Sequence, residues 1–170
     1  MSFSLAEGFV NALKAYIEAN LTAKLAALDA EYDDGIVLRP MKATLKGIKS
    51  LTLIPEYPVL YVVSPDQDVE PWNAYGDGST VKSKPHVYAG VIELNTDQET
   101  LQLLLYRYAR ALTELLMEGL GEKGLSGWDI VGSFEIDTAS SPLKTAEEGE
   151  ATPFIGEITV GFRGQKTETK

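Results

Sequence analysis

Apolar residues recur at helical spacing along the first part of the chain, and this pattern predicts a long helix over Ser4–Glu31. Ser4 and Glu7 form a capping box, in which each side chain can satisfy an orphan amide of the first turn. An Asp-Asp-Gly sequence then ends the helix, because Gly35 can adopt a left-handed conformation. The apolar positions of this helix are Val10, Leu13, Ile17, Leu21, Leu25 and Leu28.

A second helix is predicted to begin after Thr96, which serves as the N-cap of a capping box completed by Glu99. Leu103 and Tyr106 fall outside its main apolar stripe, so the helix is apolar well beyond one face. Packing on a single sheet needs a stripe of only about 100°. We therefore expect the first helix or a neighbouring subunit to cover the excess. The main stripe consists of Leu101, Leu105, Tyr108, Leu112 and Leu115, widened by Leu104, Ala111 and Leu116.

Period-two alternation and short apolar runs predict the strands. Val59–Val63 is continuously apolar and indicates a central strand that is buried on both faces. The closing strands, around Ile130–Ile136 and Ile158–Phe162, are expected to be adjacent and antiparallel. Other predicted strands are 36–38, 48–54 and 86–94. The predicted elements follow the order helix, strands, helix, strands. This order indicates an α+β fold, with a mixed, mostly antiparallel sheet packed with two long helices. Residues 1–170 are interpreted as one domain.

Two segments lack a clear pattern. Residues 65–84 hold two prolines, two glycines and many polar residues, and they are interpreted as a long inserted loop or arm. Trp72 and Tyr75 in this segment are candidate partner contacts, together with Leu103 and Tyr106 of the second helix. The alternative for the segment is a hairpin without a contact role. The polar residues 164–170 are expected to form a frayed tail.

Composition removes several classes of function. The 170 residues include 15 Lys and Arg against 25 Asp and Glu, a formal net charge of -10, which argues against nucleic-acid binding and against docking on anionic lipid. The chain has no cysteine and one histidine, which excludes thiol chemistry and multi-histidine metal sites. The start of the sequence does not read as a signal peptide, and the longest apolar run, Val59–Val63, is far short of a membrane span. We expect a soluble protein made inside the cell.

Several motifs resemble functional sites, but the residues around them do not fit those sites. Gly119–Gly124 matches G-x-G-x-x-G, but a dinucleotide site needs this motif to open a helix, whereas here it closes one. Residues 66–70 place carboxylates at alternate positions like a calcium loop, but Pro71 stands where that loop needs glycine. His86 has no neighbouring nucleophile or orienting carboxylate in the sequence. We assign no catalytic, cofactor-binding or metal-binding residue, and we interpret the chain as a non-enzymatic protein.

The order and texture of the elements suggest a family. The stretches VNALKAYIEANLTAKLAALDAEYDDGIVL, YPVLYVVSPD, HVYAGVIEL and LQLLLYRYARALTELL, followed by a closing pair of strands, resemble the tail terminator (tail completion) proteins of tailed bacteriophages. The resemblance covers about residues 5–163 and rests on element order, length and texture, without an invariant motif. Head completion and stopper proteins, which also belong to the neck, share much of this texture.

The resemblance implies a structural role in the virion, with assembly in the host cytoplasm. Tail terminators form a ring, commonly a hexamer, on the head-proximal end of the tail tube. There they end tube polymerisation and join the tail to the head connector. The implied partners are further copies of this chain, the tail tube protein, the connector or neck protein and, in contractile tails, the sheath. A ring of acidic subunits would also let DNA slide past rather than bind.

Two alternatives stay open. One is another head-tail joining protein, such as a head completion protein. The other is a small α+β enzyme or ligand-binding domain that uses His86 with Asp66 or Asp68.

Overall fold

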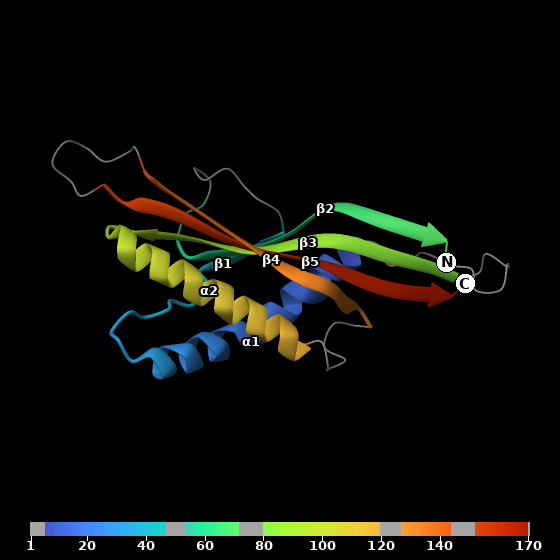
Figure 1. Ribbon diagram of the computed structural model, residues 1–170, viewed down its shortest axis with the longest axis horizontal. Coiled ribbons are helices and arrows are strands. Elements are labelled where there is room, and N and C mark those ends of the chain that lie inside the picture. The colour runs from blue at the N-terminus through green and yellow to red at the C-terminus, as the bar shows by residue number, and fades with distance from the viewer. Residues whose placement is uncertain are drawn as a thin grey trace.

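The computed structural model describes residues 6–46, 54, 56–71, 80–119, 127–143 and 152–169. These residues form two helices and one mixed sheet, which confirms the predicted α+β class (Figure 1). The strands lie in the order β1-β2-β3-β5-β4; β1 is parallel to β2, and the other neighbours are antiparallel. The elements are α1 (Ala6–Tyr32), β1 (Ala43–Lys46), β2 (Val59–Pro71), β3 (Thr80–Asn95), α2 (Gln98–Gly119), β4 (Asp129–Pro142) and β5 (Phe154–Thr169).

Both helices cover the same face of the sheet (Figure 1). Helix α1 packs on β1, β2 and β3, whereas α2 packs on β3, β4 and β5, and the helices also contact each other. The core between these layers joins the predicted apolar positions of α1 to strand residues such as Leu60, Val91 and Ile158. Because α1 lies toward β1 and α2 toward β4, the molecule has two different lateral edges.

The sequence prediction misplaced the start of α2 by one residue. The backbone amide of Thr100 donates to the Asp97 carboxylate at 2.8 Å, so Asp97 is the N-cap rather than Thr96. The amide of Asp97 in turn donates to the side chain of Asn95 at 2.9 Å. The hydrogen bond from Thr100 and the helix-start amides also lower the pKa of the Asp97 carboxyl. A charged cap at this position is favourable, since a helix N-terminus carries partial positive charge.

The predicted loop at 65–84 is largely strand. Strand β2 continues to Pro71 and β3 begins at Thr80, with Pro71 paired to Val81 across the hairpin. The predicted frayed tail at 164–170 is also wrong, because β5 continues to Thr169 and pairs with Thr80. Main-chain pairing holds these polar segments in place: β2 pairs with β3 across the hairpin, and the end of β5 pairs with the start of β3, which is distant in sequence. In Figure 1, strands β2, β3 and β5 run past the ends of both helices.

Of the two shorter predicted strands, one is wrong and most of the other lies outside the described residues. Residues 36–38 form part of an irregular connector and are not a strand. The amide of Leu38 in this connector instead donates to the Asp29 carboxylate at 2.8 Å, so a side chain of α1 takes the place of a neighbouring strand. Most of the predicted strand at 48–54 lies outside the described residues. The parallel edge strand is found just before it, at Ala43–Lys46.

The face of the sheet that the helices leave bare carries a smaller apolar cluster. Tyr61 lies at its centre, 2% exposed, and its hydroxyl bonds the Glu157 carboxylate and, at 2.8 Å, the Thr159 hydroxyl. Burial and the nearby Glu157 carboxylate raise the pKa of Tyr61. The ring fits because Gly90 lies beneath it: a Cβ at Gly90 would overlap the ring carbon Cζ. The buried members of the cluster are Ile54, Val59, Tyr61, Ile92 and Ile155.

Candidate interaction surfaces

The outer surface of α2 carries large apolar side chains that the fold does not bury. Leu103 is 43% exposed, Tyr106 54% and Met117 57%. Ile136 of the neighbouring strand β4 is 53% exposed, and its register partner Val160 belongs to the helix-side core, so Ile136 is on the same side of the sheet. We call the surface formed by Leu103, Tyr106, Met117, Glu118 and Ile136 the α2 face.

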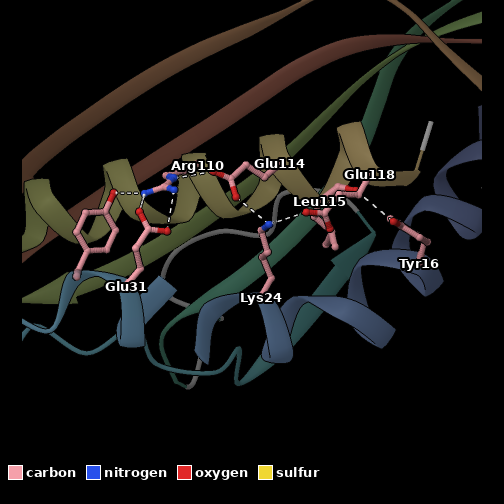
Figure 2. Close-up of polar contacts among 8 residues, drawn as sticks. Tyr16, Lys24, Glu31, Arg110, Glu114, Leu115 and Glu118 are labelled. Carbon is pink, nitrogen blue, oxygen red and sulfur yellow. Dashed lines mark hydrogen bonds and ion pairs between the residues drawn. The ribbon is translucent and has the colours of Figure 1, made fainter. Parts of the chain in front are cut away.

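An ionic network joins α1 to α2 next to this face (Figure 2). The Arg110 guanidinium donates to both carboxylate oxygens of Glu31, at 2.8 and 2.9 Å, and to the Glu114 carboxylate at 2.6 Å. Lys24 of α1 binds Glu114 at 2.8 Å and Glu118 at 2.7 Å. Five charged side chains from two helices therefore form one continuous chain of ion pairs.

Lys24 is the most buried member of the network, whereas Arg110 and Glu114 are each about one-third exposed. The Lys24 side chain is 17% exposed, whereas those of Glu31 and Glu118 are 55% and 59% exposed. The hydrogen bonds to Glu114 and Glu118 raise the pKa of Lys24, and the bonds from Lys24 and Arg110 lower the pKa of Glu114. The network holds three carboxylates against two cations, so it gives the surface beside the exposed apolar residues of α2 a small net negative charge.

A second arginine of α2 fixes the connector after α1. Arg107 is 5% exposed; it forms a bidentate pair with the Asp34 carboxylate and donates to the carbonyl of Ile36 at 3.0 Å. Its guanidinium also lies over the Tyr32 ring, 4.0 Å from the centroid. The hydrogen bonds from Arg107 lower the pKa of the Asp34 carboxyl. Sequence reasoning found no role for Arg107, because its partner is distant in the chain.

A buried carboxylate of β3 is bound by a tyrosine of α2. Glu93 is 0% exposed and accepts hydrogen bonds from the Arg39 guanidinium, from the Tyr108 hydroxyl at 3.1 Å and from the amide of Leu94 at 2.8 Å. A hollow of about 570 Å³ opens beside this group, and its rim includes Arg39 and the exposed side chain of Val37. The sequence signal for Glu93 is a carboxylate inside an otherwise apolar strand, and it was overlooked.

The opposite lateral edge of the molecule, which we call the β1 edge, has a different character. It consists of β1 and the outer side of α1, with exposed Lys42 and Lys46. Two hollows, of about 330 and 370 Å³, lie between α1 and the strands and are lined partly by apolar residues. Lys14 at this edge is paired with Glu18 at 2.7 Å, and the pKa of Glu18 is lowered by its hydrogen bond to Lys14 and by the charge of Lys46.

The candidate contact residues fall into two groups. Leu103 and Tyr106 lie together on the α2 face, whereas Trp72 and Tyr75 lie outside the described residues. The strand register places His86 opposite both Asp66 of β2 and Arg163 of β5. The imidazole ring stacks on Tyr88, with centroids 4.6 Å apart. The hollows described above are lined by other residues.

The described part of the chain contains neither a cluster of metal-ligating side chains nor a helix that could span a membrane. In these ranges, no three acidic, histidine or cysteine side chains are grouped as metal ligands would be. Neither described helix has the length and apolar character needed to cross a membrane.

Comparisons by sequence find no match, whereas the solved structures include chains similar to this one. No protein-family model matches the sequence, and no curated protein sequence matches it either. A solved structure described as the virion of a native gene transfer agent particle contains a similar chain, with 16% sequence identity and a TM-score of 0.38. The similarity covers 88% of this chain and 94% of that chain.

Proposed function

We propose that this protein is a structural subunit of a tailed-phage virion that acts as a tail terminator. Copies of it would form a ring on the head-proximal end of the tail tube, end tube polymerisation and provide the surface that binds the head connector. The observation that carries the proposal is the α2 face. Leu103, Tyr106 and Met117 are about half exposed beside a fully packed core, as expected of a surface that another protein covers.

The two edges of the molecule support assembly into a ring. A closed ring of identical subunits needs two different surfaces, one on each side of every subunit. The α2 face and the β1 edge are such a pair, because α2 packs toward β4 and α1 toward β1 at the two ends of the sheet. The element order also agrees with that of the phage family which the sequence resembles.

The decisive experiment is binding of the purified protein to purified tail tubes, followed by negative-stain electron microscopy. We expect a ring at one end of each tube, and we expect tube subunits added afterwards to leave that end unextended. Filled heads are the matched control. Binding to heads but not to tubes would contradict the proposal and favour a head completion protein.

The enzyme alternative has a specific test. The register places Asp66 opposite His86, so the pair that the alternative requires is brought together by the backbone. A His86→Ala variant that caps tubes as well as the wild-type protein would contradict a catalytic role for this histidine in the function of the protein. Loss of capping by a folded His86→Ala variant would instead implicate this part of the β2–β3 hairpin in tube contact.

A further inference from the structure

The two lateral edges expose different charged side chains. On the α2 face, the inward turn of Lys24 leaves the Glu118 carboxylate outward beside Met117. Exposed Glu99 adds to the acidic character near the start of the same helix. On the β1 edge, Lys42 and Lys46 are exposed.

The β1 edge carries carboxylates as well as lysines. Glu18 is bound by Lys14 at 2.7 Å, so these two side chains neutralise each other. Exposed Glu7 near the start of α1 and half-buried Asp29 near its end also lie on this side of the helix. The β1 edge therefore exposes two lysines, Lys42 and Lys46, beside these carboxylates.

The shapes of the two edges also correspond. The α2 face projects side chains that are about half exposed, including Tyr106 and Met117. The β1 edge is hollowed between α1 and the strands, and its hollows include the side chains of Val10 and Val62 in one and Leu21 in the other. One edge thus projects apolar groups, whereas at the other edge the hollow beside Val10 has a mostly apolar surface and the hollow beside Leu21 a mostly polar one.

We propose that the α2 face of one copy docks on the β1 edge of the next copy, in a head-to-tail contact. The exposed apolar side chains of α2 enter the hollows between α1 and the strands, while Glu118 lies near Lys42 and Lys46 of the neighbour. Contact between two α2 faces is disfavoured, since it would bring like carboxylates together. The inference rests on the proposed ring and specifies which surfaces of neighbouring subunits meet.

The test uses two variants that each disable one edge. Tyr106→Glu/Met117→Glu changes exposed residues of the α2 face, and Lys42→Glu/Lys46→Glu reverses the charge of the β1 edge. Native mass spectrometry of each variant alone should show monomer, whereas an equimolar mixture should show a 1:1 dimer and nothing larger, because a single pair of intact edges remains. Val37→Glu, which alters an equally exposed apolar residue outside both edges, is the control and should assemble as the wild-type protein does.

Cysteine trapping covers the case of weak association, since the natural chain contains no cysteine. Tyr106→Cys and Lys42→Cys proteins, mixed at millimolar concentration under oxidising conditions, should form a disulfide-linked heterodimer in at least tenfold excess over a Tyr106→Cys and Thr167→Cys mixture. Absence of that excess, or normal assembly of Lys42→Glu/Lys46→Glu alone, would overturn the inference.

The outcomes also separate this inference from the proposed function. If the mixed variants dimerise as expected but the wild-type protein fails to bind tube ends, the contact stands and the terminator role falls. If Lys42→Glu/Lys46→Glu caps tubes as well as the wild-type protein does, the role stands and the contact falls.

Discussion

The hydroxyl of Tyr108 lies 3.1 Å from Oε2 of Glu93, and both side chains are completely buried. The same hydroxyl is 3.2 Å from the amide and from the carbonyl of Arg39, so one phenol joins α2, β3 and the connector before β1. This arrangement stabilises the buried carboxylate, because each oxygen of Glu93 accepts a hydrogen bond.

Tyr108→Phe should lower the free energy of unfolding by about 1–3 kcal/mol, because it leaves a buried carboxylate oxygen without its donor. Urea unfolding followed by circular dichroism measures the change. Tyr106→Phe is the matched control on the same helix, since that tyrosine is 54% exposed, and it should change stability by less than about 0.5 kcal/mol. Equal effects of the two substitutions would contradict the role of the Glu93 cluster.

Gly90→Ala should destabilise the protein by about 1–3 kcal/mol, because the new methyl group would overlap the ring of Tyr61. The ring cannot move aside easily, since its hydroxyl is bonded to Glu157 and Thr159. The same urea assay on Tyr61→Leu and on the double variant completes a mutant cycle. We expect the cost of Gly90→Ala to shrink when Tyr61→Leu is already present, and purely additive effects would argue against the clash.

Asp97→Ala should cost about 1 kcal/mol of stability, because it removes the acceptor for the amide of Thr100. Thr96→Ala is the control and should be nearly neutral, although the sequence pattern had pointed to Thr96 as the cap. Thermal unfolding of the two variants side by side distinguishes the positions. A larger loss of stability from Thr96→Ala than from Asp97→Ala would instead identify Thr96 as the N-cap.

The stability contributed by the interhelical ion pairs should depend on pH. Bonding to Lys24 and Arg110 depresses the folded-state pKa of Glu114 below its ordinary value of 4.5. Its contribution is therefore complete above about pH 4.5 and is lost as the pH falls through the lower folded-state value. We expect Glu114→Gln to reduce stability at pH 7 by less than about 1 kcal/mol, and to reduce it less at pH 3.

Denaturant unfolding at several pH values measures this difference, with Glu99→Gln as an exposed control on the same helix. The effect of Glu114→Gln at pH 7 should also shrink in 1 M salt, where exposed charges are screened. A loss of stability that stays constant from pH 7 to pH 3 would show that Glu114 acts through packing rather than charge.

Hydrophobic periodicity was sufficient to predict the helices and the centres of the main strands. It also identified the excess apolar surface of α2: Leu103 and Tyr106, which fall outside the main stripe, are exposed in the structure. Their contact with a partner remains a prediction. The pairing of β4 with β5 was likewise recognisable, because both strands alternate over several residues.

The sequence could not reveal features that depend on distant pairing. Residues 164–169 are polar, but they are strand because β3 pairs with them along its first residues. The same is true of the interhelical network, in which Glu31 and Arg110 are 79 residues apart in the sequence. Charged residues on helices usually indicate a solvated face, and nothing local distinguishes those that bind each other across an interface.

The length of β3 has a mechanical consequence. Residues 80–86 extend the strand by about 20 Å beyond Val87, at roughly 3.3 Å per residue. Because it pairs with β2 on one side and with β5 on the other, this extension is a three-stranded antiparallel sheet, which is stiffer than a loop. A tilt of a few degrees at the base would therefore shift its tip by an ångström or more, so that a small adjustment of one subunit could be transmitted to whatever the tip touches.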